Sequence, residues 1–573
     1  MTSTTRPAGA DTADVGTAPA GTVDADTADK VPAPAAEAAP AGGSDPSNGF
    51  LAKAALVTAV LTVAGSVLGL VRDQALAHFF GAGSETDAFL VAWTLPEVAT
   101  TLLIEDGLAF ALVPAFSMAL ARRGQGARRD PVRALVAASL PRLMLGSGAV
   151  ALILMAGAPV VVEVLAPGLP DPRLAVDCTL LTATCVFTFG LAGYCSAALR
   201  AHRRFVAPAA IYVFYNIGII TAVFVLAPRY GVRAAAMGVA AGGVLMVLVQ
   251  APSLWRQLSR DTAGVPHEEE KGPSAPALMS TALIATVLLF ALCRQSQVLI
   301  ERFLASSLPS GAISHLNYAQ KVAQVPMILS LMLCTVTLPV VARALAEGDV
   351  KRARSRVERD LGLAGCVVLL GTAVVIACAP QLIQLLFQRG AFTVRDTEAT
   401  AAVMRVYALG LLGHTLVGAL VRSYFSAGRP TWFPLGAMAA GIAATAGIGS
   451  WTVDLWGVRG IALANAAGIS VTACVLLRGM GPRNVPIRVR RVLGELAKPV
   501  AAAVCATAAG WALAGLFGAP LAAVAAGSPA VVAVFVLVLW ALKAQSFEPV
   551  RRSVTPRVTS AVSSATRKLT HVR

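Results

Sequence analysis

The stretch LMLGSGAVALILMAGAPVV, residues 143–161, contains no charged side chain. A second stretch, VAAAVCATAAGWALAGLF at residues 500–517, has the same character. A helix that crosses a bilayer needs about 20 mainly apolar residues, and these blocks approach or meet that length. Of the 573 residues, 56% are hydrophobic and 14% are charged, whereas soluble proteins carry roughly 25% charged residues. The sequence therefore predicts an all-α polytopic membrane protein.

Apolar blocks of this kind recur along the chain and predict about fourteen transmembrane helices. The blocks are separated by short polar or basic stretches, which are typical of loops. The expected centres of the helices are Ser66, Leu103, Ala149, Phe187, Gly218, Gly243, Leu288, Ser330, Leu370, Leu409, Ala440, Gly468, Ala508 and Val532.

The basic residues are distributed unevenly between alternate loops. Arginine and lysine gather at residues 122–133, 200–204, 351–359 and 478–491, whereas residues 80–86 and 518–520 contain neither. Cytoplasmic loops carry such an excess, so the pattern predicts a multi-pass membrane protein with both termini in the cytoplasm. It also accounts for most of the net charge of +16, and we expect no nucleic-acid partner.

An internal repeat divides the chain. Residues 231–242 (GVRAAAMGVAAG) match residues 457–468 (GVRGIALANAAG) at seven of twelve positions, with an offset of 226 residues. The offset spans six predicted helices, an even number, so the copies have the same orientation in the membrane. Parallel repeats are typical of transporters that bind their cargo between two halves.

Composition and the repeat together predict six regions. A disordered cytoplasmic tail precedes the first helix, and two six-helix lobes, joined by a cytoplasmic linker, are followed by a helix pair and a basic cytoplasmic tail. The expected ranges are 1–49 for the first tail, 50–254 for the N-lobe, 255–275 for the linker, 276–480 for the C-lobe, 481–543 for the pair and 544–573 for the basic tail.

Ionisable residues at membrane depth are concentrated in the first two helices of each predicted lobe. Such residues usually line a cavity or pair with one another. Arg72 is interpreted either as a cation that binds an anionic headgroup or as the partner of Asp73 or Asp87. Lys321 has a similar role or extends toward the interface. Arg294 is a further candidate for the cavity.

Two acidic residues of the second helix have two interpretations. Glu97 and Glu105 either bind protons or cations as a coupling site, together with Asp73, or pair with Lys321 or Arg294. The cores of the helices centred on Leu288 and Ala440 are expected to hold no carboxylate, which argues against a sodium site there. The chain contains no P-loop, HExxH or nucleophile-elbow motif, so we expect no catalytic residue, metal site or cofactor, and no enzyme activity.

Several motifs resemble the MurJ/MviN lipid II flippase family of the multidrug/oligosaccharidyl-lipid/polysaccharide exporter superfamily. The resemblance covers roughly residues 51–542. The segments that carry it are GSVLGLVRD (65–73), FGAGSETDAFL (80–90), LP (95–96), LNYAQK (316–321), QVP (324–326) and FQRGAFT (387–393).

The resemblance implies two six-helix lobes and a final helix pair that forms a lipid groove. It implies a flippase of the bacterial cytoplasmic membrane that moves a lipid II-like, undecaprenyl-diphosphate-linked peptidoglycan precursor outward by alternating access. The cytoplasmic tails are expected to contact cell-wall synthesis proteins. Arg72 and Asp87 match positions of the family's cavity. Arginines of the family pattern are replaced by Ser66, Thr100, Thr101 and Lys321, and Glu97 stands where the family often has asparagine.

These replacements make the expected cavity less basic and leave three hypotheses. The first is a flippase for a lipid II-like precursor. The second is an exporter of another lipid-linked glycan or of a small amphiphile. The third is a membrane scaffold that keeps the fold without transport.

Overall fold

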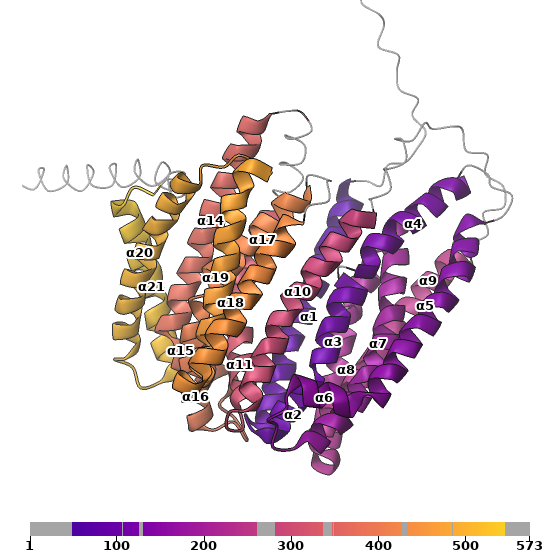
Figure 1. Ribbon diagram of the computed structural model, residues 1–573, viewed down its shortest axis with the longest axis horizontal. Coiled ribbons are helices and arrows are strands. Elements are labelled where there is room, and N and C mark those ends of the chain that lie inside the picture. The colour runs from indigo at the N-terminus through magenta and orange to yellow at the C-terminus, as the bar shows by residue number, and fades with distance from the viewer. Residues whose placement is uncertain are drawn as a thin grey trace, which may run out of the picture. The chain divides into compact units, whose positions relative to one another are not determined.

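The computed structural model describes residues 48–105, 107–124, 130–259, 281–335, 347, 349–426, 432–483 and 485–544. These residues form helices and loops and contain no strand. The predicted first tail, the linker and the basic tail lie largely outside the described ranges. The described residues from Ala52 to Ala544 belong to one compact unit, which Figure 1 shows from the side.

The helices before residue 260 build the first part of this unit. Their bounds are α1 Asn48–Phe80, α2 Ser84–Ala92, α3 Thr94–Ala99, the π-helix η1 Thr100–Glu105, α4 Gly107–Gly124, α5 Pro131–Ala156, α6 Ala158–Leu165, α7 Pro172–Ala201, α8 Val206–Tyr230 and α9 Arg233–Leu258. Helix α7 packs against α2, α3, η1, α4, α5 and α9 and so lies at the centre of this part.

The remaining helices follow from residue 281. Their bounds are α10 Thr281–Ser306, α11 Ala312–Ala323, α12 Val325–Thr335, α14 Val350–Ala377, α15 Ala379–Phe387, α16 Val394–Ala408, α17 Leu411–Ser426, α18 Phe433–Trp456, α19 Val458–Arg483, α20 Val489–Ala514 and α21 Pro520–Ala541. Helix α10 contacts α3, η1 and α4 on one side and α11, α18 and α19 on another. It therefore joins the two parts of the unit (Figure 1).

Among the described residues, eleven helices are long and apolar enough to cross a membrane, or twelve if α16 and α17, bent by 47°, are one span. The protein is thus a multi-pass helical membrane protein, as predicted. All predicted centres lie within described helices except Leu409, which lies at the bend between α16 and α17. The count of fourteen stays a prediction, since it requires α10 and the broken pair α11/α12 to cross as well.

The two copies of the repeat fold alike. Helix α8 ends at Gly231, with φ 56° and ψ −142°, and α18 ends at Gly457, with φ 54° and ψ −131°. Residues with a side chain rarely adopt this conformation, which explains why both copies use glycine. After each glycine the next helix packs back closely, as α9 on α8 and α19 on α18. The structure therefore supports the internal repeat.

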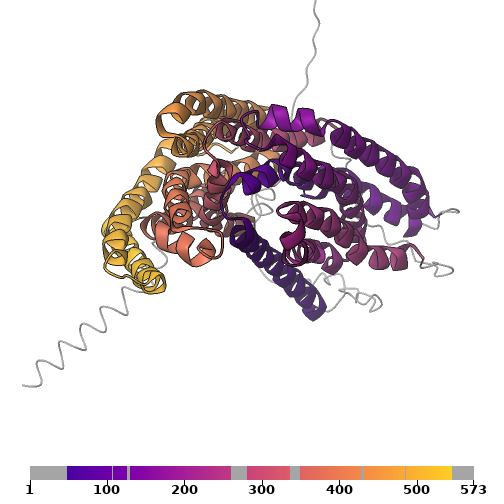
Figure 2. The ribbon, with the colours of Figure 1, turned by 90° about the horizontal axis from the view of Figure 1, so that it is seen from below.

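The last two helices pack together and flank one edge of the unit. Helix α20 contacts α14, and α21 contacts α14 and α15. The pair lies at the yellow end of the chain, beside these helices, in both views (Figures 1 and 2). Small residues allow this approach, because a Cβ at Gly510 would lie 2.2 Å from Val531 Cγ2 of the neighbouring helix.

Candidate functional site

The second predicted membrane segment is broken into α2, α3, η1 and α4 where its charged residues lie. Pro96 has no N–H, so the carbonyl of Ala92 lacks its usual helical donor. The hydroxyl of Thr182 on α7 donates to that carbonyl at 3.1 Å. A π-helix follows, a feature that is frequent at functional sites. The break places Glu97 in the first turn of α3 and Glu105 at the end of η1.

Arg72 of α1 is buried, with three groups around its guanidinium. Its Nε and Nη2 donate to Asp73 Oδ1 at 3.0 and 2.7 Å, and its Nη1 donates to Asn216 Oδ1 of α8 at 3.2 Å. The ring of Trp93 lies 4.4 Å from the guanidinium carbon, a cation–π contact. Of the two partners considered from the sequence, Asp73 is therefore the one that pairs with Arg72.

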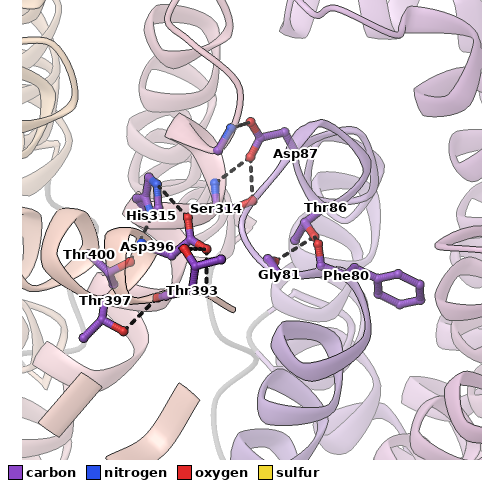
Figure 3. A network of polar contacts seen from close by, with 11 residues as sticks. Phe80, Gly81, Thr86, Asp87, Ser314, His315, Thr393, Asp396, Thr397 and Thr400 are labelled. Carbon is purple, nitrogen blue, oxygen red and sulfur yellow. Dashed lines mark hydrogen bonds and ion pairs between the residues drawn. The ribbon is translucent and has the colours of Figure 1, made fainter. Parts of the chain in front are cut away.

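Asp87 of α2 binds the beginning of α11, a helix more than 200 residues further along the chain. One carboxylate oxygen accepts from Gly311 N at 2.6 Å, and the other accepts from Ser314 N at 2.7 Å and Ser314 Oγ at 2.5 Å (Figure 3). The first amides of a helix have no internal partner and carry a partial positive charge. Asp87 thus caps α11 from the other part of the unit.

A second set of polar contacts surrounds this cap on the side of α16. His315 Nδ1 lies 2.9 Å from Thr400 Oγ1, and its Nε2 lies 3.9 Å from Asp396 Oδ1. Asp396 also forms a capping box with Thr393 at the start of α16 (Figure 3). These contacts hold the first turns of α11 and α16 together.

Glu97 pairs with Arg302 of α10. The carboxylate Oε2 accepts from Arg302 Nη2 at 2.9 Å, and the Thr94 hydroxyl accepts from Arg302 Nη1. The Arg302 side chain is 6% exposed, whereas that of Glu97 is 28% exposed. On the same face of α10, Gln295 donates to the carbonyl of Glu97 and to Thr101 Oγ1. Arg302, and not Lys321 or Arg294, is therefore the ion-pair partner of Glu97.

The other predicted site residues lie around this pair in different environments. Lys321, in the last turn of α11, is half-buried and interacts electrostatically with Glu97, as does Arg72. Arg294 is exposed on α10, and Glu105 is exposed and accepts a hydrogen bond from Tyr212 at 3.1 Å. Glu97 is thus hydrogen-bonded to Arg302 and interacts electrostatically with Lys321 and Arg72, while Asp87 lies at the helix cap.

Two further charged residues lie in α10, Glu301 and Arg302, and neither was among the residues predicted from the sequence. Glu301 is 4% exposed and accepts a hydrogen bond from Asn465 of α19, whose Oδ1 lies 3.1 Å from His414 Nε2. The expectation of no carboxylate concerned the core of the apolar block, and Glu301 lies beyond that core, in the last two turns of α10. The signal was the adjacent pair ER at 301–302 inside VLIERFLA.

Comparisons with known proteins agree on one family. A family model described as "Lipid II flippase MurJ" matches residues 76–528. The lipid II flippase MurJ of Burkholderia cenocepacia is 28% identical over 445 residues, covering 75% of this chain and 84% of that protein. The probable lipid II flippase MurJ of Rhizobium meliloti is 27% identical over 475 residues, covering 80% and 87%.

Solved structures show the same fold. A structure of the lipid II flippase MurJ in an inward closed conformation superposes with a TM-score of 0.67 at 18% identity, covering 85% of this chain and 99% of that one. An inward-facing multidrug resistance transporter of the MATE family superposes with a TM-score of 0.59 at 16% identity, covering 77% and 99%.

Proposed function

This chain belongs to the lipid II flippase MurJ family, and on that premise we propose that it moves a lipid II-like peptidoglycan precursor across the bacterial cytoplasmic membrane. The cargo carries a polyprenyl diphosphate, which passes from the inner to the outer leaflet. The protein thereby contributes to cell-wall synthesis and cell shape.

The observation that carries the proposal is the group of cations around Glu97. Arg72, Arg302 and Lys321 come from α1, α10 and α11, so both parts of the unit contribute to it. Buried guanidinium and ammonium groups need an anionic partner, and a guanidinium matches the geometry of phosphate oxygens. Arg302 also adds a buried arginine to a region in which Thr100 and Thr101 replace arginines of the family pattern. The reduced basic character inferred from the sequence is therefore partly restored by α10.

The mechanism that we propose is alternating access between the lobes at 50–254 and 276–480. The diphosphate binds near α3, α10 and α11, and the lipid tail lies along the groove of α20 and α21. Both termini lie in the cytoplasm, as the arginine-rich loops indicate. The N-terminal tail, with the basic tail from residue 544, is the proposed contact for cell-wall synthesis proteins.

The experiment that tests the proposal is complementation of bacteria depleted of their own lipid II flippase. The wild-type chain is expected to restore growth and the appearance of lipid II in the outer leaflet. The double variant Arg72→Ala with Lys321→Ala is expected to fail at equal membrane abundance. The matched control is Asp177→Asn, which removes a charge from the exposed ion pair with Arg233. Growth without lipid II in the outer leaflet, or full activity of the double variant, would contradict the proposal.

The same experiment separates the alternatives. A chain that restores neither growth nor lipid II translocation, yet exports another lipid-linked glycan or an amphiphile, is an exporter of a different cargo. A chain that does neither and still binds cell-wall synthesis proteins is a scaffold. Both alternatives lack the support that family membership gives to the flippase.

A further inference from the structure

We propose that Glu97 is an internal counterion that occupies the anion site of the empty carrier and is displaced by the cargo's diphosphate. This inference rests on the proposed function, and it assigns to Glu97 a role in selecting and releasing anionic cargo. The side chain is then neither a coupling site nor a purely structural acid.

The first argument is the unequal burial of the pair. Arg302 is 6% exposed, and its hydrogen bonds go to the Thr94 hydroxyl and to the carboxylate of Glu97. A buried guanidinium without an anion is strongly destabilising, so Arg302 requires such a partner in every state of the protein. Glu97, at 28% exposure, is the member of the pair that solutes reach first.

The second argument is the charge around Glu97. Its carboxylate interacts electrostatically with Arg302, Lys321 and Arg72. Arg72 is already neutralised by Asp73 at 2.7 Å. Glu301 also interacts electrostatically with Arg302, but it is hydrogen-bonded to Asn465. When Glu97 is displaced, Arg302 and Lys321 both lose its carboxylate. A diphosphate brings at least two negative charges, so it fits the site better than one carboxylate.

The third argument is the local backbone. Glu97 lies directly after Pro96, in a short helix between the break at Trp93 and the π-helix η1. Its position is therefore set by six residues of α3 rather than by a long rigid helix. A segment built in this way is suited to carry the carboxylate away from Arg302 when a stronger anion arrives.

The consequence is selection by charge. A neutral or cationic amphiphile cannot replace Glu97 on Arg302, because it would leave the guanidinium buried and unpaired. After the cargo leaves, Glu97 returns to Arg302 and prevents a second anion from remaining bound. The counterion thus lowers the affinity for the cargo and speeds its release.

The test compares the purified wild-type chain with Glu97→Gln and with the control Asp177→Asn, which removes an equal charge from an arginine ion pair elsewhere. Each protein is titrated in detergent with lipid II, with inorganic pyrophosphate and with uncharged undecaprenol. Glu97→Gln is expected to bind both phosphorylated probes about tenfold more tightly and to release lipid II more slowly. Its undecaprenol binding, and all binding by Asp177→Asn, are expected to match the wild type.

Glu97→Asp keeps the charge but shortens the side chain, so it provides a second test if the glutamine variant does not fold. It is expected to bind pyrophosphate with an affinity between those of the wild type and Glu97→Gln. Equal or weaker phosphate binding by the Glu97 variants overturns the counterion role, as does the absence of pyrophosphate binding in every protein. If pyrophosphate binding follows the expectation and lipid II does not bind, the counterion role stands and the proposed cargo is wrong.

Discussion

Replacing Asp87 by asparagine tests the cap that joins α2 to α11. The carboxylate accepts three hydrogen bonds, from Gly311 N and from the N–H and hydroxyl of Ser314. Hydrogen bonds to charged groups contribute about 1.5–3 kcal/mol each, and a buried donor left without an acceptor costs about 1–3 kcal/mol. Asparagine keeps one carbonyl oxygen but turns an NH₂ group toward the remaining donor. We therefore expect the contact to weaken by about 3 kcal/mol.

A change of 1.4 kcal/mol corresponds to a factor of ten in an equilibrium constant, so separation of α2 from α11 becomes roughly 100-fold more frequent. The assay is maleimide labelling of Ala312→Cys, because Ala312 is 2% exposed at the start of α11. The exposed Cys474 and Cys505 are replaced first. Purified protein in detergent is labelled with and without Asp87→Asn.

The labelling rate is expected to rise by one to two orders of magnitude with Asp87→Asn and to stay unchanged with Asp177→Asn. Thermal unfolding is recorded in parallel, because a general loss of stability would expose other buried cysteines as well. A labelling rate within about threefold of the parent would show that the cap does not hold α2 and α11 together.

Three further substitutions test packing and polar contacts through thermal unfolding in detergent. Gly468→Ala is expected to destabilise the protein by more than about 2 kcal/mol, because its Cβ would lie 1.9 Å from Thr445 Oγ1. The control Gly447→Ala is expected to be neutral or slightly stabilising, because no atom lies within 4 Å of its Cβ. Equal effects of the two substitutions would contradict the close packing of α18 and α19. Thr182→Val is expected to cost about 1–2 kcal/mol, since it leaves the Ala92 carbonyl without its donor, and an unchanged midpoint would refute that role. Arg302→Ala is expected to cost about 2 kcal/mol by removing the hydrogen-bonded partner of the Glu97 carboxylate, with a partial recovery when Glu97→Ala is added. Additive losses would show that the two side chains are not coupled.

The sequence predicted the helices well because the bilayer imposes a simple requirement. About 20 apolar residues must be consecutive in each span, and this pattern is local. The repeat was also visible, because Gly231 and Gly457 occupy positions that demand positive φ in both copies. Where the pattern was interrupted, the sequence was less informative. The second predicted membrane segment is broken at Trp93 and at η1. The position of each break depends on Pro96 and on the packing of this segment against α7.

The partners of the charged residues could not be predicted in the same way. Hydropathy shows that placing Arg72, Glu97 and Lys321 in a membrane is energetically unfavourable, but it does not show which groups compensate for this. Asp73 is adjacent to Arg72 and was a natural candidate. Arg302 is 205 residues from Glu97, and only the packing of α10 against α3 brings the two together. Comparing a motif position by position reveals that an arginine is absent, but it does not reveal that an arginine of another helix takes its place.

This explains why the sequence suggested less positive charge near Glu97 than the structure places there. Thr100 and Thr101 follow Glu97 on the broken segment, and the hydroxyl of Thr101 accepts a hydrogen bond from Gln295 of α10. An arginine at this position would need its own anion, whereas threonine does not. Arg302 then enters from α10, and Glu97 supplies the carboxylate that a buried guanidinium requires. These residues therefore form one set, in which α10 provides the cation Arg302 and α3 provides its counterion Glu97, next to Thr100 and Thr101.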